Sequence, residues 1–407
     1  MSASIVSLII RIGWHSREVT DMSASKDTNK EKITNDKAQG TLSRTPLYEE
    51  HLDLGATMSP FAGFEMPVQY QGILEENLAT REHVGIFDVS HMATFRVSGE
   101  GGSAFLQHIL TNDLEKISNI GAAQYTLLLD LDGGIIDDLI VYNTGGEYML
   151  IANASNRETV YEWLQQNLPD NPAGDPRDEV FIFDESDRTA LIAVQGPEAI
   201  DVITELAADE DWEPPARFHI IAAELIGGAR VLVARTGYTG EDGVELIMHK
   251  EDAVSVWRAL LSFDNVTPVG LGARDTLRLE MGYHLYGNDM DRGRNPIEAS
   301  LGWVCPKGKE GYIGYEVVTA AREKGVSEKL VHMTVTGGIP REGFPVFDGD
   351  QQIGTIASGS HSPALGSGIA TAYVPTKYSK VGTKLKVGIR KRRADATVVR
   401  PPFLKGD

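Results

Sequence analysis

Residues 133–142 have the sequence Gly133-Gly134-Ile135-Ile136-Asp137-Asp138-Leu139-Ile140-Val141-Tyr142. Six of these ten residues are Ile, Leu, Val or Tyr, and they follow glycines that are typical of a turn, so the stretch predicts one strand of a hairpin. Because strand side chains alternate between faces, we expect Asp138 on the face of Ile136, Ile140 and Tyr142, and Asp137 on the other. A buried carboxylate is costly without a partner. One aspartate should therefore face a ligand, a polar partner or a wet cleft, unless it only caps turn N–H groups.

The composition limits the classes of protein that the chain can belong to. Its 407 residues are enough for two or three domains, and 42% hydrophobic with 24% charged residues is ordinary for a soluble globular protein. A net charge of −20 and a pI of about 4.9 argue against nucleic-acid binding and against anionic membranes. The single cysteine, Cys305, excludes an internal disulfide and fits a reducing compartment. No His-Glu-x-x-His or Cys-x-x-Cys spacing occurs, so the sequence predicts no metal site.

The first 44 residues differ from the rest of the chain. Residues 5–10 are apolar apart from Ser7 but too few to span a membrane, and residues 25–44 form a polar tract that predicts disorder. The arginines and serines of this extension suggest a transit peptide, and the other explanation is a start assigned too far upstream, with Met22 as the true start. The absence of a cleavage signature favours the second explanation. We expect the folded chain to begin near Thr45.

Hydrophobic periodicity predicts mixed helices and strands without a strict βαβ rhythm up to about residue 300, and short strands alone after residue 329. The expected helices are 75–83, 103–110, 155–167, 197–207, 253–261, 271–283 and 315–324. The expected strands are 125–129, 135–142, 148–153, 189–195, 231–236 and 244–248, followed by 331–335, 353–358, 369–374, 384–389 and 396–399. Ser155 and Glu158 suggest a capping box at the start of the third helix. The last five strands predict a small all-β C-terminal domain.

A second dense motif is Gly237-Tyr238-Thr239-Gly240-Glu241-Asp242-Gly243-Val244-Glu245. Its glycines allow a sharp turn that lets backbone approach a ligand closely. Beyond the turn, Glu245 should share a strand face with Ile247, while Val244, Leu246 and Met248 take the other face. A carboxylate placed in this way suits the N–H edge of a ligand such as an aminopyrimidinone. A solvated hairpin glutamate is the alternative.

The helix expected at 271–283 carries Arg274, Leu277, Arg278 and Met281 on one stripe. Two guanidinium groups among apolar residues need partners, and Asp275 can supply one for Arg278. Arg274, near the helix start, is a candidate for binding an anionic group. The preceding Gly-Leu-Gly lacks the third glycine of a dinucleotide loop, and neither a P-loop nor a Gly-x-Ser-x-Gly elbow is present. His91 alone is better explained as a hydrogen-bonded structural histidine.

Taken together and in order, several blocks resemble the glycine cleavage T-protein family, the folate-dependent aminomethyltransferases. They are Thr45-Pro46-Leu47-Tyr48, Phe87-Asp88-Val89-Ser90-His91-Met92, Gly134-Ile135-Ile136-Asp137-Asp138-Leu139, Val194-Gln195-Gly196-Pro197, Gly237-Tyr238-Thr239-Gly240-Glu241, Gly272-Ala273-Arg274-Asp275-Thr276-Leu277-Arg278-Leu279-Glu280, Leu285-Tyr286-Gly287-Asn288-Asp289-Met290-Asp291 and Pro401-Pro402-Phe403. The resemblance covers residues 45 to 403. It implies an α+β, three-domain cloverleaf around a central folate channel. Its divisions would be a disordered extension at 1–44, interleaved folate-binding domains at 45–320 and a β-barrel at 321–407.

The resemblance also implies site residues. It makes Asp138 the catalytic acidic group, and it assigns folate contacts to Met92, Tyr125, Tyr142, Asn153, Tyr238, Glu245, Arg274 and Tyr283. Some family members place a tyrosine near the C-terminus as a ligand contact, but this chain ends Phe403-Leu404-Lys405-Gly406-Asp407. The contacts to the folate tail are therefore the least defined.

The implied reaction transfers an aminomethyl-derived one-carbon unit from the lipoyl arm of the glycine cleavage carrier (H) protein to tetrahydrofolate, with release of ammonia and no metal. The implied location is the cytoplasm, or the mitochondrial matrix if residues 1–44 are a transit peptide. Two alternatives stay open. One is a folate-dependent demethylase of a sulfonium or N-methyl compound. The other is a non-catalytic iron–sulfur assembly factor, whose Lys-Gly-Cys-Tyr-x-Gly-Gln signature is not matched by the cysteine-free Lys309-Glu310-Gly311-Tyr312-Ile313-Gly314.

Overall fold

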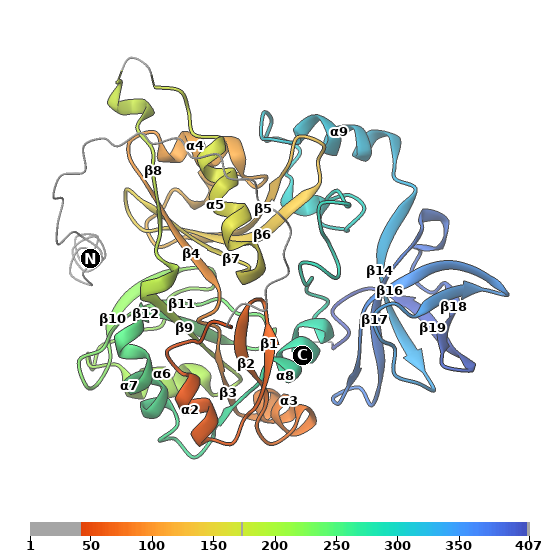
Figure 1. Ribbon diagram of the computed structural model, residues 1–407, viewed down its shortest axis with the longest axis horizontal. Coiled ribbons are helices and arrows are strands. Elements are labelled where there is room, and N and C mark those ends of the chain that lie inside the picture. The colour runs from red at the N-terminus through yellow and green to blue at the C-terminus, as the bar shows by residue number, and fades with distance from the viewer. Residues whose placement is uncertain (1–41, 172–173, 405–407) are drawn as a thin grey trace.

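The computed structural model describes residues 42–171 and 174–404, and Figure 1 shows them as three lobes. Two lobes contain one β-sheet each and lie against one another, and the third is a barrel at the C-terminal side. This arrangement is the α+β fold that was expected. Nearly all of the predicted extension at 1–44, including both explanations for it, lies outside the described residues.

A six-stranded sheet forms the first lobe, in the order β10-β11-β12-β9-β3-β13, and only β13 and β3 pair in parallel. Helices α6 and α7 bury Ile203 and Trp257 against one face of this sheet. The strands are β3 (Val84–Asp88), β9 (Thr189–Gln195), β10 (Ile220–Glu224), β11 (Arg230–Ala234), β12 (Gly243–His249) and β13 (Val266–Pro268). The neighbouring helices are α2 (Tyr48–Asp53), α3 (Ile73–Glu82), α6 (Ala199–Leu206), α7 (Ala253–Leu260) and α8 (Leu271–Glu280), and a separate ribbon pairs β1 (Thr57–Phe61) with β2 (Phe64–Gln69).

A five-stranded sheet forms the second lobe, in the order β5-β6-β7-β4-β8. Helices α4 (Gly102–Ile109) and α5 (Arg157–Gln166) cover its outer face. Its inner face meets the first sheet, because Tyr142 and Ile151 pack in one cluster with Leu191 and Ile247 of the six-stranded sheet and with Leu277 of α8. The strands are β4 (Ala93–Ser98), β5 (Ala123–Leu129), β6 (Ile135–Asn143), β7 (Tyr148–Ala152) and β8 (Phe181–Asp184).

One residue of the decisive strand lies on a different face from the one that strict alternation predicts. The pairing of β5 with β6 shifts register at Leu128 and Leu129, and the shift falls beside Ile136. Ile136 consequently packs among residues of the outer face, with Leu139, rather than on the face of Asp138. A bulge adds one residue to one strand and reverses the alternation on one side of it. The predicted placement of Ile136 is therefore wrong, whereas the shared face of Asp138 and Tyr142 is confirmed.

The capping box at Ser155 is also wrong. A short 3-10 turn, Ala154–Asn156, precedes α5, so the N-cap is Asn156, and its side chain caps nothing. The Asn156 amide instead donates to the Asp137 carboxylate at 2.8 Å. The buried aspartate competes for the side chain that would otherwise cap the helix.

The third lobe is a closed barrel in the order β14-β17-β16-β15-β18-β19. Five of its strands coincide with predicted runs, and the four-residue β15 was not predicted, because it is too short to show periodicity. The strands are β14 (Glu328–Thr336), β15 (Pro345–Asp348), β16 (Gln351–Ser362), β17 (Ser367–Pro375), β18 (Lys384–Ile389) and β19 (Arg392–Val399), and α9 (Tyr315–Lys324) precedes them.

A buried ion pair between α8 and the segment after it is hydrogen-bonded to the barrel. Arg278 Nη1 lies 2.6 Å from Asp289 Oδ2, and Ser358 of β16 accepts from Arg278 Nη2 at 2.9 Å and donates to Asp289 at 3.0 Å. The expected pairing of Asp275 with Arg278 is confirmed, at 2.8 Å. All four groups lie at the junction of the body and the barrel, so this network fixes how the barrel sits on the rest of the molecule.

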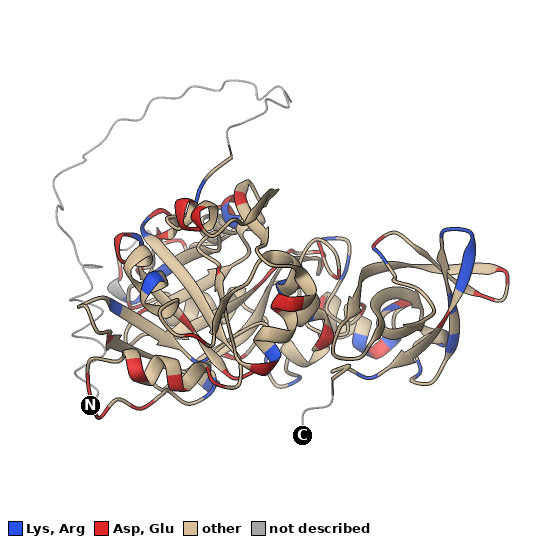
Figure 2. Ribbon diagram, turned by 90° about the horizontal axis from the view of Figure 1, so that it is seen from below, with Lys and Arg blue, Asp and Glu red and all other residues tan. Residues whose placement is uncertain are grey.

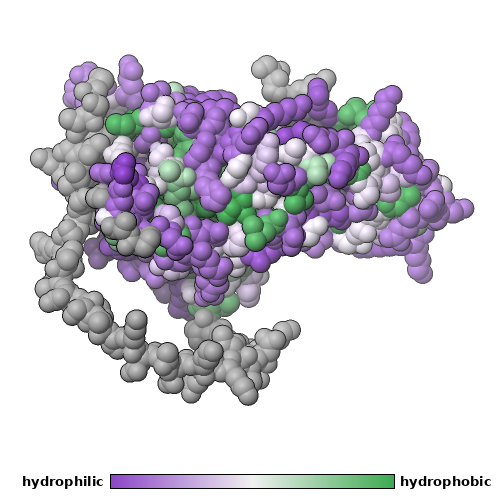
Figure 3. Space-filling view, turned by 90° about the horizontal axis from the view of Figure 1, so that it is seen from above, coloured by the Kyte–Doolittle hydropathy of each residue, from purple (hydrophilic) through white to green (hydrophobic). Residues whose placement is uncertain are grey.

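The face shown in Figure 3 is hydrophilic over most of its area. Figure 2 shows acidic and basic residues interspersed over the body and a group of basic residues on the barrel, where exposed Arg390, Lys391, Arg392 and Arg393 form the tip of the β18–β19 hairpin. Figure 3 shows apolar residues gathered near the middle of one face. Within residues 42–171 and 174–404, no helix is both long and apolar enough to cross a bilayer.

Candidate functional site

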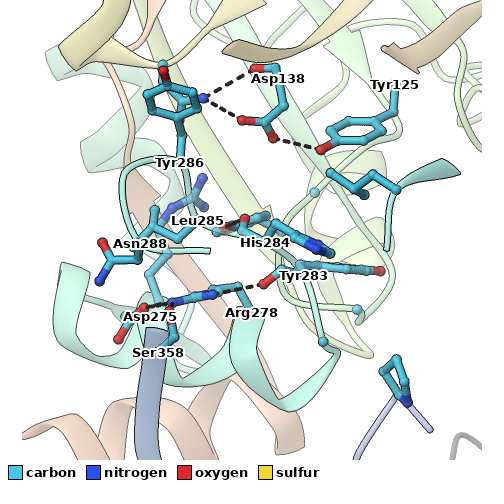
Figure 4. Close-up of a pocket in the computed structure, with 18 of the residues that line it drawn as sticks. Tyr125, Asp138, Asp275, Arg278, Tyr283, His284, Leu285, Tyr286, Asn288 and Ser358 are labelled. Atoms are coloured by element: carbon cyan, nitrogen blue, oxygen red, sulfur yellow. Dashed lines mark hydrogen bonds and ion pairs between the residues drawn. The ribbon is translucent and has the colours of Figure 1, made fainter. Parts of the chain in front are cut away.

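A cavity of about 1320 Å³ lies between the two sheets and extends toward the barrel. Strands of both sheets, the turn before β12, the start of α8 and the segment after α8 all contribute to its lining (Figure 4). All nine site residues that the sequence pointed to line this one cavity: Met92, Tyr125, Asp138, Tyr142, Asn153, Tyr238, Glu245, Arg274 and Tyr283. Residues up to 191 positions apart in the chain are thereby brought together.

One side of the cavity, the carboxylate wall, consists of Asp138, Tyr125 and Asn153. Tyr125 Oη donates to Asp138 Oδ2 at 3.0 Å, and Asn153 Nδ2 donates to Asp138 Oδ1 at 2.8 Å (Figure 4). Burial raises the pKa of Asp138, and these two donors oppose the rise because they favour the carboxylate. Burial, helped by the charge of Asp138, also raises the pKa of Tyr125, so this phenol stays a hydrogen-bond donor.

Asp137 lies behind this wall and is fully buried. Its carboxylate accepts from the backbone N–H of Asn153 at 3.1 Å and from the side-chain amides of Asn153 and Asn156, both at 2.8 Å. Asn153 Nδ2 therefore bridges the two aspartates. Burial raises the pKa of Asp137 well above its usual range, and the charge of Asp138 adds to the rise. Asp137 does not line the cavity, so the two adjacent carboxylates have different surroundings, as the strand alternation predicts.

The opposite side, the arginine wall, consists of Glu245, Arg274 and Tyr238. Thr236 donates to Glu245 Oε2 at 2.5 Å, and Tyr142 Oη lies 3.1 Å from the same hydroxyl, so Tyr142 donates to Thr236. The parity predicted for β12 is confirmed, because Ile247 packs toward the other sheet while Val244, Leu246 and Met248 pack toward α6 and α7. Glu245 is thus held in the cavity and is not a solvated hairpin residue.

Arg274 has a buried polar atom without a partner. Its Nη1 makes no hydrogen bond to any described residue, and its guanidinium carbon lies 4.9 Å from the centre of the Tyr238 ring. Burial lowers the pKa of Arg274, and the charge of Glu245 partly opposes this. A buried donor that is left unpaired costs free energy, so Nη1 is available for an acceptor on a ligand.

Tyr238 is fixed by contacts on two sides. Its hydroxyl donates to the backbone carbonyl of His284, and its ring stacks on that of Tyr283, with 5.9 Å between the ring centres. In Figure 4, Tyr283 and His284 lie on the side of the cavity that faces Asp138 and Tyr125. Arg278, by contrast, contributes its charge to the barrel junction, so of the two arginines on the α8 stripe only Arg274 is left for a ligand.

Comparisons with known proteins agree with this geometry. The GCVT N-terminal domain family matches residues 47–309, and the glycine cleavage T-protein C-terminal barrel domain family matches residues 328–405. Together they span most of the chain. The chain belongs to the glycine cleavage T-protein family.

Similar T-protein relatives come from several organisms. The aminomethyltransferase of Chloroherpeton thalassium is 47% identical over 366 residues, which cover 88% of this chain and 98% of that protein. The aminomethyltransferase of Halothermothrix orenii is 42% identical over 368 residues, covering 89% and 100%. The crystal structure of the glycine cleavage system aminomethyltransferase T from Bartonella henselae has a TM-score of 0.82 at 32% identity and covers 89% of this chain and 98% of its own. By these relatives, the T-protein chain is an aminomethyltransferase.

Several residues of this T-protein site were not found from the sequence. Thr236 lies two residues after β11 and directly before the Gly237 motif, and no sequence pattern marked it as a site residue. Trp303 and His284 belong to segments without hydrophobic periodicity. His91 was expected to be hydrogen-bonded, but its buried Nδ1 has no partner among the described residues, and it lines the cavity. Burial lowers the pKa of His91 to about 4, so the ring is neutral near pH 7. Within the described residues, no three His, Cys, Asp or Glu side chains group as a metal site would need.

Proposed function

We propose that the chain transfers the one-carbon unit of an aminomethyl thioether, held on the lipoyl arm of a carrier protein, to tetrahydrofolate. The observation that carries this proposal is that the carboxylate wall and the arginine wall, which differ in chemistry, face each other across one cavity. Asp138 has its two partners in place on one wall, and Glu245 and Arg274 offer unused hydrogen-bonding capacity on the other. Two large ligands need two such surfaces.

The arginine wall suits the pterin of the folate. Glu245 accepts one bond from Thr236 and has remaining lone pairs for an N–H/NH₂ edge. Arg274 Nη1 is a donor without an acceptor in the described part of the chain, and a pterin or its attached carbonyl groups supply acceptors. Arg274 also lies over the ring of Tyr238, so this arginine borders an aromatic part of the lining.

Asp138 suits the reacting centre. In the transfer, the C–N bond to ammonia breaks, the folate N5 and then N10 bond to the carbon, and the C–S bond breaks. The protons of N5 and N10 end on ammonia and on the carrier thiol, so no oxidant is needed. Positive charge develops at the carbon and at nitrogen, and a carboxylate held by Tyr125 and Asn153 stabilises this charge without reorganising. Positioning of the two ligands supplies a further share of the rate.

The proposed partner is the lipoylated carrier protein of the glycine cleavage system, and the proposed location is the cytoplasm, or the mitochondrial matrix if residues 1–44 are a transit peptide. The folate-dependent demethylase of sulfonium or N-methyl compounds is the second candidate, because the same arginine wall would bind its folate. The segment Lys309–Gly314 contains no cysteine, which disfavours the iron–sulfur assembly factor.

The decisive experiment measures turnover with aminomethylated carrier and tetrahydrofolate, in parallel with dimethylsulfoniopropionate and sarcosine. Production of ammonia and methylenetetrahydrofolate from the carrier alone is expected. Binding is checked separately, because tetrahydrofolate at about 100 times its Kd should stabilise the chain by roughly 2.7 kcal/mol. Glu245→Ala should remove most of this stabilisation. Turnover of either small methyl donor at a higher kcat/KM than the carrier would reject the proposal in favour of the second candidate.

A further inference from the structure

Trp303 is a large apolar side chain that is exposed at the lining of the cavity. It lies on the 3-10 turn Gly302–Val304 and is 67% exposed, although the other tryptophans in residues 42–171 and 174–404 are buried or half-buried. Its ring stacks on Tyr125 with 5.8 Å between the ring centres and an angle of 21° between the planes. A tryptophan offers a large, rigid apolar face to a ligand that lies beside it.

The turn that carries Trp303 is anchored on both sides. Leu301 and Val304 are buried in one cluster with Leu127 of β5. Arg322 of α9 donates to the carbonyl oxygens of Gly302 at 2.9 Å and Cys305 at 2.7 Å. Because its neighbours are fixed, Trp303 is held outward with one ring face on Tyr125. Its exposure is therefore a property of the fold and not of a loose loop.

Trp303 is joined to the reacting carboxylate through one residue. Tyr125 stacks on Trp303 and donates a hydrogen bond to Asp138 at 3.0 Å. An extended ligand that lies along the Trp303 ring therefore has only the Tyr125 ring between itself and Asp138. Leu301, two residues before Trp303, also lines the cavity. The unpaired polar groups that suit a pterin lie across the cavity, on the arginine wall. The carboxylate wall and the arginine wall therefore differ in chemistry.

We propose that Trp303 is the contact for the hydrocarbon arm of the carrier, and that this arm enters along the carboxylate wall while the folate occupies the arginine wall. This inference rests on the proposed function. An arm of methylene groups that ends in sulfur gains apolar burial and a favourable sulfur–aromatic contact on the indole face. Trp303 is thus a specificity-determining residue for the arm and not for the folate.

The test compares Trp303→Ala with Trp303→Phe and with Phe181→Ala. Phe181 is a matched control, since it is 50% exposed on β8 and does not line the cavity. Each variant is assayed with aminomethylated carrier and with aminomethylated dihydrolipoamide, and its tetrahydrofolate Kd is measured by calorimetry. We expect Trp303→Ala to raise KM for both arm substrates about 10-fold, as loss of one apolar contact predicts. Trp303→Phe should restore most of the loss, and the folate Kd should not change.

A binding measurement keeps this inference separate from the proposed function. Dihydrolipoamide should quench the tryptophan fluorescence of the wild-type chain, and the quenching should be lost in Trp303→Phe whether or not turnover occurs. Quenching that persists in Trp303→Phe would overturn the inference. A weaker folate Kd in Trp303→Ala with unchanged KM for both arm substrates would also overturn it, because it would place Trp303 on the folate side. Wild-type quenching without any turnover would reject the proposed function alone.

Discussion

The two walls of the cavity differ in how complete they are. On the carboxylate wall, both oxygens of Asp138 accept hydrogen bonds from the protein. On the arginine wall, counting partners among residues 42–171 and 174–404, Arg274 Nη1 is buried without an acceptor and Glu245 accepts only from Thr236. A group whose partners are built into the protein keeps its position when a ligand arrives, whereas an unpaired group gains its partner only on binding.

This difference assigns a separate role to each wall. A preorganised carboxylate acts on charge that appears during the reaction, so removing its charge should affect kcat. An unpaired donor acts on the bound ligand itself, so its removal should affect affinity. Variants on the carboxylate wall should therefore change kcat, and variants on the arginine wall should change the Kd for folate.

The largest effect is expected from Asp138→Asn. The amide keeps the size of the side chain and one acceptor but cannot carry the negative charge, so kcat should fall about 10²- to 10⁴-fold. Folate affinity, measured by calorimetry, should change little. Because burial raises the pKa of Asp138, activity that needs the carboxylate should rise with pH through a value above the ordinary aspartate range, and this acid limb should vanish in the variant.

Asp137→Asn is the matched control for that variant, because it makes the same change one residue away, behind the wall. Wild-type turnover in Asp138→Asn, or a larger loss of kcat in Asp137→Asn, would contradict the assignment of Asp138. Unfolding of Asp138→Asn would show that the residue is structural.

The next effect concerns His91, which lies on the side of Arg274. Its pKa in the folded protein is about 4, against an ordinary value of 6.5, because burial and the charge of Arg274 outweigh the opposing charge of Asp88. Between pH 6.5 and 4 the unfolded chain binds a proton that the folded chain does not, so the free energy of unfolding should fall by roughly 3 kcal/mol as the pH drops. His91→Phe should flatten this part of the stability curve, measured by denaturant unfolding, and equal slopes would refute the claim.

A smaller effect is expected for Arg274→Met. The variant removes the unpaired donor but keeps a long apolar side chain beside Tyr238. The Kd for tetrahydrofolate should rise roughly 10- to 100-fold, the size of one hydrogen bond to a charged group, while kcat at saturating folate stays near its wild-type value. A fall in kcat without a change of Kd would contradict the assignment of folate affinity to the arginine wall and of kcat to the carboxylate wall.

The smallest effect is expected for Asp137→Asn itself. Its carboxylate holds three N–H groups, and an amide can accept only part of this set, so the free energy of unfolding should decrease by about 1–3 kcal/mol. Thermal and urea unfolding measure the loss. Full stability in this variant would show that Asn153 and Asn156 find other acceptors.

The sequence predicted local structure better than the relation between distant segments. Alternation placed Glu245 and Tyr142 on the correct faces because each depends only on neighbours in one strand. Alternation failed at Ile136 because a bulge depends on the partner strand, and the capping box failed because Asn156 reaches a buried aspartate 19 positions away.

The site was predicted in its members but not in its arrangement. The resemblance named nine residues that share one cavity, yet nothing in the sequence shows that Asp138 and Arg274 lie on opposite walls. Trp303 and His91 were missed as site residues because exposure and an unpaired ring nitrogen are visible only in three dimensions.

The ion pair between Arg278 and Asp289 bears on how modular this protein is. The two matched domain families suggest a body and a barrel that evolution could exchange or delete independently. Yet Asp289 is held both by Arg278 of α8 and by Ser358 of the barrel, and Tyr373 of the barrel donates to the Asp289 carbonyl at 2.7 Å. A foreign barrel without these hydroxyl groups would leave the ion pair intact but would take away hydrogen bonds that its buried members now make. Body and barrel are thus expected to change together over evolutionary time, as one inherited unit.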